Sequence, residues 1–298
     1  MGKGFCYDAK LVLSALHSLR IDLHSHSTYS DGVLTPTALI QRASRNRVDL
    51  LALTDHDEVG GVAEAAAAAR AAGIGFVAGV EVSVTWAGLT LHVLGLGIDP
   101  RNAQLSSGLA GIRKSRAVRA VQIARQLGAS GIADSLDGAS RFAGDAAAIG
   151  RGHFARFLVH QGHAADTKNA FKKYLVPGKC GYVAHQWASL GQAIGWIRNA
   201  GGHAVLAHPD QYRLVPLKMQ ALLDDFKQQG GQALEISGGL RANPMSQIRA
   251  AKYFGFSLSA GSDFHTAAHG SADLGDIPAI PEGARRLWQD ADMFPSAV

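Results

Sequence analysis

Short apolar segments alternate with helical patterns along most of this chain, and that alternation is the feature that most limits its fold. In the second half, buried strands are predicted at His203–Ala207, Ala233–Ser237 and Ser257–Ala260, with a helical pattern between each pair. Repeated strand–helix units favour a mainly parallel sheet with both faces covered. The sequence therefore predicts an α/β fold.

The first half shows the same strand–helix alternation, except for a predicted hairpin and a long helical segment. Thr35 and Pro36 mark a helix start, because threonine caps a helix and proline fits its first position. The apolar runs Ile74–Val82 and Thr90–Gly97 are close enough to form a hairpin. Over residues 101–175 helical patterns replace the strand-like runs, which predicts a helical insertion.

Histidines and acidic residues follow the predicted strands at six places. They are His24 with His26, then His56, Glu81, His92 and His208, and finally Asp263 with His265. The carboxyl ends of barrel strands converge on one rim, where α/β barrels build their active sites. Coincidence at six strand ends is far less plausible than at one, so a shared site is predicted.

The chemistry of these side chains favours bound metal ions. Alternate side chains of an extended segment point the same way, so His24 and His26 can share one cation. The chain has 13 histidines but only 2 cysteines, and imidazole with carboxylate suits Mn, Fe or Zn. Because the ligands exceed the needs of one ion, two or three divalent ions are expected. Asp55 and Asp57 flank His56 and point away from it, so supporting roles are predicted for them.

Composition and charge exclude several classes of protein. Cys6 and Cys180 form no C-x-x-C pair, which disfavours thiolate zinc sites and disulfides and favours a reducing, cytoplasmic location. No segment approaches the roughly 18 apolar residues of a membrane span, and no signal peptide is expected. The net charge of +5 suits an anionic substrate but forms no nucleic-acid-binding stripe. Nothing in the sequence indicates an obligate protein partner.

Six segments resemble those of the PHP (polymerase and histidinol phosphatase) family and occur in the family's order: IDLHSHSTYSDG, LALTDHD, GVEVS, LHVLG, AHP and GSDFH. The resemblance implies a distorted (β/α)7 TIM-like barrel built from residues 21–100 and 176–298. Residues 101–175 would be a helical insertion that caps the substrate. Residues 1–20 precede the family pattern and are expected to be an N-terminal extension.

The resemblance also implies a trinuclear metal site, with manganese as the expected ion. His24, His26, Glu81 and Asp263 would hold the first ion, Glu81, His92 and His208 the second, and Asp31, His56 and His265 the third. A hydroxide bridging two metals would attack phosphorus. Glu81 and Asp263 are the expected catalytic residues, the first as the bridge between cations and the second in orienting the hydroxide or relaying its proton.

Within the family, the insertion and the segment KYLVPGKCGYVAHQWASL resemble bacterial phosphoesterases that act on nucleoside 3′,5′-bisphosphates and AMP. The expected function is therefore hydrolysis of nucleotide phosphomonoesters. A 5′-3′ exoribonuclease on short RNA and a histidinol-phosphate phosphatase are the alternatives, and an amidohydrolase or a non-catalytic metal-binding module is more remote. The amidohydrolase would usually need a bridging lysine, and no lysine occurs between Lys10 and Lys114.

The second phosphate of such a substrate needs a cationic contact. Arg151 is the first candidate, because a guanidinium binds phosphate oxygens in bidentate fashion. Further candidates are His153 beside a predicted helix start, Lys179 in a turn near the barrel mouth and His185 in the branch-like segment. Taken singly, each of the four also fits an ordinary surface or core position.

Overall fold

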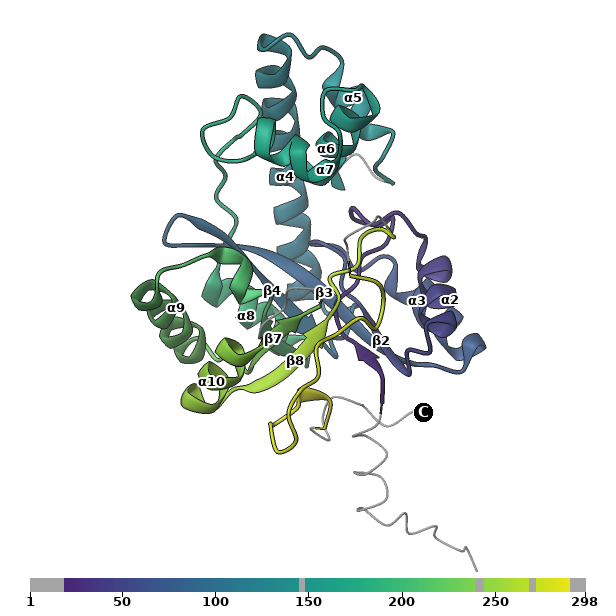
Figure 1. The fold of residues 1–298 in the computed structure, drawn as a ribbon, viewed down its shortest axis with the longest axis vertical. Helices are drawn as coiled ribbons and strands as arrows, with labels where there is room; N and C mark the ends of the chain where they lie inside the picture. The colour runs from purple at the N-terminus through teal and green to yellow at the C-terminus, as the bar shows by residue number, and fades with distance from the viewer. Residues whose placement is uncertain (1–18, 145–147, 239–243, 268–271, 290–298) are drawn as a thin grey trace, which may run out of the picture.

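A computed structural model describes residues 19–144, 148–238, 244–267 and 272–289. The predicted N-terminal extension, residues 1–20, therefore lies almost entirely outside the described residues. Figure 1 shows a barrel-shaped sheet with helices around it, and a second, helical lobe above the barrel.

The barrel wall is one sheet. Its strands are β1 (Ile21–Asp22), β2 (Leu50–Leu53), β3 (Gly75–Trp86), β4 (Leu89–Leu96), β5 (Ala188–Ser189), β6 (His203–Leu206), β7 (Ala233–Ser237) and β8 (Ser257–Gly261). Within the described part of the chain, seven of them are arranged in the order β1-β2-β3-β4-β6-β7-β8, while β5 pairs with β3 alone. The pairings of β4 with β3 and β6 are antiparallel and the others are parallel, so the predicted hairpin is confirmed.

The two ends of the sheet meet and nearly close it. The backbone N–H of Leu23 donates to the carbonyl of Ala260, and that of His26 donates to the carbonyl of Phe264, both at 2.9 Å. These contacts join the segment after β1 to β8 and the loop that follows it. The predicted distorted (β/α)7-like barrel is confirmed.

Helices cover the outside of the barrel and form the insertion. The barrel helices are α2 (Pro36–Arg45), α3 (Val62–Ala72), α8 (Leu190–Asn199), α9 (Pro216–Gln228) and α10 (Met245–Phe254). The insertion contains α4 (Ala103–Ala129), α5 (Ser135–Ser140), α6 (Arg151–His160), α7 (Thr167–Ala170) and a π-helical turn (Phe171–Leu175). Short 3-10 turns lie at Pro209–Tyr212 and Leu287–Gln289. The predicted Thr35 cap is present, since its side chain accepts a hydrogen bond from the backbone of Ala38.

The described residues form three hydrophobic clusters, two in the barrel and its helices and one in the insertion, and α4 contributes to two of the three. Its first half places Leu105 and Leu109 in a barrel cluster, and its second half places Ile123 and Leu127 in the insertion cluster. The long helix therefore links the barrel to the helical lobe (Figure 1). Within the described part of the chain, no helix combines the length and apolar character that crossing a membrane requires.

Candidate metal centre

The nine predicted metal-binding residues each lie in a barrel strand or in the segment that follows one. His24, His26 and Glu81 are fully buried. His208 and Asp263 come directly after or close behind β6 and β8 in left-handed backbone conformations, with φ of 31° and 56°. Such conformations are uncommon outside glycine, so the turns after these strands are held by their surroundings. They direct both side chains toward the other ligands at the rim.

His24, His26, Glu81 and Asp263 form the first group, and their ligand atoms all lie within 4.8 Å of one another. Nε2 of His24 lies 3.0 Å from Nε2 of His26. Asp263 Oδ1 lies 3.3 Å from the first of these nitrogens and 3.2 Å from the second. This group contains the four residues that the family resemblance assigns to one metal ion.

Glu81 also connects the first group to a second one. Its Oε2 lies 2.8 Å from Nδ1 of His56. Its Oε1 lies 3.0 Å from Nδ1 of His92 and 3.1 Å from Nε2 of His208. The two oxygens thus face different histidines, which is the arrangement that a carboxylate bridging two cations needs.

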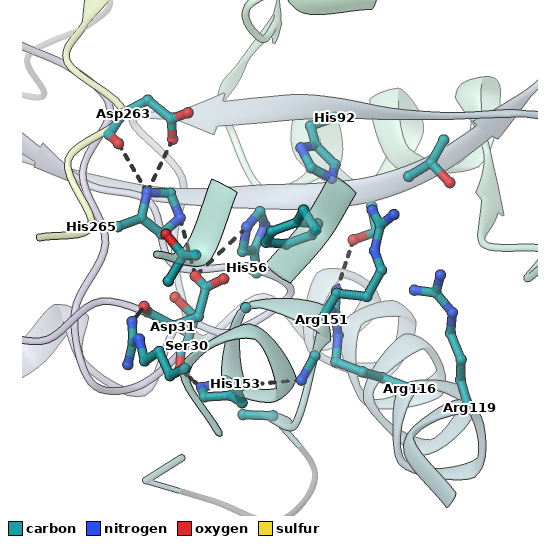
Figure 2. A pocket seen from close by; sticks show the side chains of 18 of the residues that line it. Ser30, Asp31, His56, His92, Arg116, Arg119, Arg151, His153, Asp263 and His265 are labelled. Atoms are coloured by element: carbon teal, nitrogen blue, oxygen red, sulfur yellow. Dashed lines mark hydrogen bonds and ion pairs between the residues drawn. The ribbon is translucent and has the colours of Figure 1, made fainter. Parts of the chain in front are cut away.

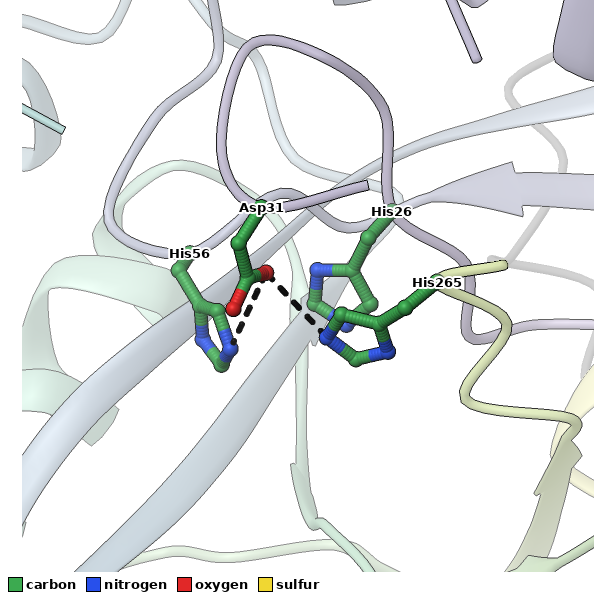
Figure 3. Close-up of side chains that lie close together, drawn as sticks. All are labelled: His26, Asp31, His56 and His265. Atoms are coloured by element: carbon green, nitrogen blue, oxygen red, sulfur yellow. Dashed lines mark ion pairs between the residues drawn. The ribbon is translucent and has the colours of Figure 1, made fainter. Parts of the chain in front are cut away.

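Asp31 is the centre of a third group, with His26, His56 and His265. Figure 3 shows its carboxylate between the rings of His56 and His265. Its Oδ1 lies 3.1 Å from Nε2 of His265 and 3.8 Å from Nε2 of His56. Geometry adds His26 to the three residues expected here, so His26 stands between the first and third groups.

The arrangement of the ligand atoms suits coordination of metal ions better than hydrogen bonding between the side chains. Asp31 Oδ1, Glu81 Oε2 and His56 Nδ1 are buried and have no hydrogen-bond partner. The last two lie only 2.8 Å apart, yet their geometry is not that of a hydrogen bond. Buried polar atoms left unsatisfied are costly, and cations held by these lone pairs would satisfy them. The donors are nitrogen and carboxylate oxygen, as Mn, Fe or Zn would require.

The electrostatics of the cluster favour cation binding, because its carboxylates are ionised and one of its histidine rings is neutral. Burial opposes ionisation of Glu81, but the surrounding histidines, led by His56 and His92, outweigh it and hold the pKa of that carboxylate well below its usual range. Burial, with His265 nearby, lowers the pKa of His26 to about 3, so its ring is neutral and keeps a free lone pair. Burial also opposes protonation of His265, yet Asp31 and Asp263 raise its pKa to about 10. Carboxylates that stabilise a proton here would also stabilise a metal cation.

Asp55 and Asp57 lie beside the cluster and stabilise the segments that carry it, as expected. Asp55 accepts hydrogen bonds from the backbone and hydroxyl of Ser27. Asp57 accepts from the backbone and hydroxyl of Ser83 and pairs with Arg116 of α4. Asp57 therefore connects the insertion helix to the barrel strands next to His56.

A cavity of about 380 Å³ opens between the cluster and the insertion. Figure 2 shows Asp31, His56, Asp263 and His265 on one side, and Arg116, Arg119 and Arg151 on the other. Four arginines line it: Arg116, Arg119, Arg151 and Arg156. Arg116 pairs with Asp57, and Arg156 donates to the carbonyl of Asp31.

Arg119 and Arg151 have no carboxylate within ion-pair distance among the residues described. Arg119 is only 5% exposed and donates to the carbonyl of Val183. Burial, together with Arg151 and Arg116, lowers its pKa to about 10, so the guanidinium remains charged near neutrality. A buried positive charge that no carboxylate neutralises is costly and is available to an anionic ligand.

The other predicted substrate contacts are placed differently. Arg151 and His153 both line the cavity, but both ring nitrogens of His153 already have partners, the backbone N–H of Gly150 and the carbonyl of Ser30. Lys179 is exposed and is not among the lining residues. His185 contacts Ser115 and the ring of Trp187 behind the cavity wall.

Sequence reasoning missed several residues of this site. Arg116 and Arg119 belong to a charged helical pattern, and their i, i+3 spacing predicts only that they share one face of the helix. It does not predict that this face lines the cavity. Glu235 is a carboxylate inside the apolar strand β7, and a charge in a buried strand is itself a signal of a partner. Tyr212 donates to the carbonyl of Ala207 and accepts from the backbone N–H of His92, which no pattern indicated.

The chain is similar in sequence to known proteins over most of its length. The PHP domain family model matches residues 22–176, just over half of the chain. The 3′,5′-nucleoside bisphosphate phosphatase of Chromobacterium violaceum is 48% identical over 91% of this chain and 96% of its own length. The 5′-3′ exoribonuclease Rnm of Escherichia coli is 40% identical over 90% of this chain and 92% of its own.

Solved structures agree with the fold. A Chromobacterium violaceum protein described as an amidohydrolase, with bound sulfate and no metal, has a TM-score of 0.86 and 47% identity, covering 91% of this chain and 95% of that one. A Bifidobacterium adolescentis protein predicted to be a metal-dependent phosphoesterase has a TM-score of 0.77 and 27% identity, covering 87% and 92%. With the nine converging side chains, these similarities show that the chain belongs to the PHP domain family.

Proposed function

We propose that this chain is a metal-dependent phosphoesterase that removes a phosphate from nucleoside 3′,5′-bisphosphates and also hydrolyses AMP. The observation that carries the proposal is the pair Arg119 and Arg151, which line one cavity with the metal-ligand cluster and have no carboxylate partner among the residues that the structure describes. A substrate with two phosphates can place one at the cluster and the other on these guanidinium groups. The name of the Chromobacterium violaceum relative supports the same substrate class.

The nine residues of the cluster would hold two or three divalent ions, with Mn as the proposed ion. When bound, such ions activate water and neutralise the charge of a phosphoryl group. The chain's own part is to keep the ligands ionised and oriented. Glu81 and Asp263 are the proposed catalytic residues, because Glu81 faces histidines with both oxygens and Asp263 is a partly exposed carboxylate that lines the cavity.

We propose that residues 101–175 act as the substrate cap. They supply Arg116, Arg119, Arg151 and Phe171 to the cavity wall opposite the cluster. The ring of Phe171 lies 5.7 Å from the Arg151 guanidinium and that of Trp187 lies 4.8 Å from the Arg116 guanidinium. Aromatic packing of this kind limits the motion of the arginines and orders them before substrate binds.

A 5′-3′ exoribonuclease is the second candidate, because the Escherichia coli relative with that name matches nearly the whole chain. The same two arginines would then bind the 5′-phosphate of an RNA end, and the cluster would act on the next phosphate.

A cytoplasmic location also stays a prediction, supported by Cys180, which is exposed and unpaired.

The test is a comparison of substrates with the same metal-loaded protein. We expect metal analysis after gentle purification to give two to three ions per chain. The values of kcat/KM for adenosine 3′,5′-bisphosphate, AMP, histidinol phosphate and a short 5′-phosphorylated oligoribonucleotide are then measured. Asp263→Asn is the control for contaminating phosphatases and should be inactive.

Adenosine 3′,5′-bisphosphate should be the best small substrate. A preference for histidinol phosphate would reject the nucleotide assignment, and a much higher kcat/KM for the oligoribonucleotide would favour the exoribonuclease. Activity on amides without activity on phosphoesters would reject the phosphoesterase.

A further inference from the structure

Glu235 is a buried carboxylate beside the metal centre, and it is neither one of the nine candidate metal ligands nor a proposed substrate contact. It lies in β7 and is fully buried. Its Oε1 lies 2.8 Å from Nδ1 of His24, and its Oε2 accepts a hydrogen bond of 2.7 Å from the backbone N–H of His208. One side chain therefore contacts two proposed metal ligands that come from different strands.

We propose that Glu235 is a positioning residue that sets the ring of His24 and the turn at His208 so that both ligands face the metal ions. This inference rests on the proposed metal site. A histidine that binds a metal through one ring nitrogen commonly donates the other N–H to a carboxylate, which fixes its tautomer and orientation. With Nδ1 on Glu235, His24 directs Nε2 toward Glu81 and Asp263, at 3.4 Å and 3.3 Å.

The contact with His208 acts on the backbone. His208 has φ of 31° and ψ of 56°, a conformation that non-glycine residues seldom adopt. Its N–H donates to an ionisable oxygen, and hydrogen bonds to a charged acceptor are stronger than neutral ones. Glu235 thus stabilises the turn that carries the His208 ring to Oε1 of Glu81, 3.1 Å away.

The packing around Glu235 leaves little room for another arrangement. Gly261 of β8 lies against both residues, since a Cβ at that position would be 2.2 Å from Cβ of His24 and 2.8 Å from Oε1 of Glu235. The absence of a side chain at Gly261 therefore lets His24 and Glu235 meet beneath the metal centre.

The test measures metal binding directly. Chelator-treated protein is titrated with Mn²⁺ by calorimetry for the parent chain, Glu235→Gln, Glu235→Asp and Ser259→Ala. Glutamine keeps the size of the side chain but cannot accept from His24 and His208 with two carboxylate oxygens. Aspartate keeps the charge but is one methylene too short to reach both partners. Ser259 is the matched control, because it lies opposite Glu235 in the β7–β8 register and is equally buried.

We expect Glu235→Gln to weaken Mn²⁺ binding by about 10- to 100-fold, with an unchanged circular dichroism spectrum and with kcat recovered at saturating Mn²⁺. Glu235→Asp should be weakened too, and it decides the question if the glutamine variant does not fold. Ser259→Ala should bind as the parent does. Parent-like affinity in a folded Glu235 variant would overturn the inference alone, whereas a parent chain that binds no Mn²⁺ would overturn the proposed function as well.

Discussion

At the scale of single residues, the cost of function is most visible at Arg119. Its guanidinium is buried, has no carboxylate partner among the described residues and has a pKa lowered to about 10. Desolvation of this charge opposes folding, while the contact with the Trp187 ring at 5.3 Å and the bond to Val183 recover only part of the loss. A buried charge of this kind is what the proposed phosphate-binding role of Arg119 would require.

Replacing this charge should therefore stabilise the protein while weakening it as an enzyme. We expect Arg119→Met to raise the free energy of unfolding by ~1 kcal/mol, because a buried charge is replaced by an apolar chain of similar length. Inorganic phosphate should raise the melting temperature of the parent more than that of the variant. Urea denaturation measures the first effect, and thermal unfolding with and without phosphate measures the second. A variant that is clearly less stable than the parent would show that Arg119 has mainly a structural role.

Arg151 should act in binding more than in chemistry. Loss of a hydrogen bond to a charged group costs roughly 1.5–3 kcal/mol, so Arg151→Ala should raise KM for adenosine 3′,5′-bisphosphate by about tenfold or more. KM for a simple aryl phosphate, which has no second phosphate, should change little. Lys179→Ala is the control, because Lys179 is exposed and does not line the cavity. Equal effects of Arg151→Ala on both substrates would remove the proposed role.

Eight of the nine metal-ligand candidates could be named from sequence because they lie in a strand or shortly after one, and strand ends of a barrel converge on one rim. Asp31 lies in the turn that follows β1, and only the family resemblance identified it. Of the four arginines that line the cavity, Arg151 was predicted from sequence, but Arg116, Arg119 and Arg156 were not, because their convergence depends on how the insertion packs over the barrel. Arg116 pairs with Asp57, 59 residues earlier in the chain. Charge alone does not distinguish such a contact from a solvated helix face.

At the scale of elements, α4 shows how packing outweighs helix propensity. Gly108 and Gly111 are both in its first half. A Cβ at Gly108 would lie 2.5 Å from the fused ring atoms of Trp196 in α8, whereas a Cβ at Gly111 would meet nothing within 4 Å. The two glycines share a helix but differ in their surroundings, so they make a matched pair.

Alanine at these positions should have opposite effects. Gly111→Ala should stabilise the protein by about 0.5–1 kcal/mol, because alanine loses less conformational entropy in a helix. Gly108→Ala should destabilise it by roughly 1–3 kcal/mol, because the indole must shift in a packed interface. Thermal unfolding of both variants beside the parent gives the comparison. If Gly108→Ala were as stable as Gly111→Ala, the α4–α8 contact would not be close-packed.

Most elements were predictable where a single periodicity or cap dominates. The helix predicted from Thr35 and Pro36 is α2, and the strand at Ala233–Ser237 is β7 with the same bounds. The apolar segment that begins at Ile21 predicts a strand as far as His24, but β1 ends at Asp22, and backbone hydrogen bonds of Leu23 and His26 then close the barrel. The two-residue strand β5 was not predicted, because it is defined only by its pairing with β3.

At the scale of the whole molecule, the barrel holds the metal-ligand candidates and the insertion holds the arginines opposite them. None of the nine candidates lies within residues 101–175. The insertion has its own hydrophobic cluster, which includes Phe154 and Phe157. Metal ions and phosphate should therefore stabilise different parts of the same protein, and hydrogen exchange can separate the two effects.

Removal of metal should loosen the barrel rim first. Without cations, the buried carboxylates of Glu81, Asp31 and Asp263 are neutralised only by neighbouring histidine rings, so amides in the segments after β1 and β2 should exchange at least about tenfold faster. Metal at 100 times its Kd should raise the free energy of unfolding by about 2.7 kcal/mol. Amides around Phe154 and Phe157 should exchange at the same rate with or without metal. Phosphate should instead slow exchange in the first turn of α6, where Arg151 lies. Equal acceleration of barrel and insertion on chelation would mean that the two lobes unfold as one unit and that the metal centre stabilises both.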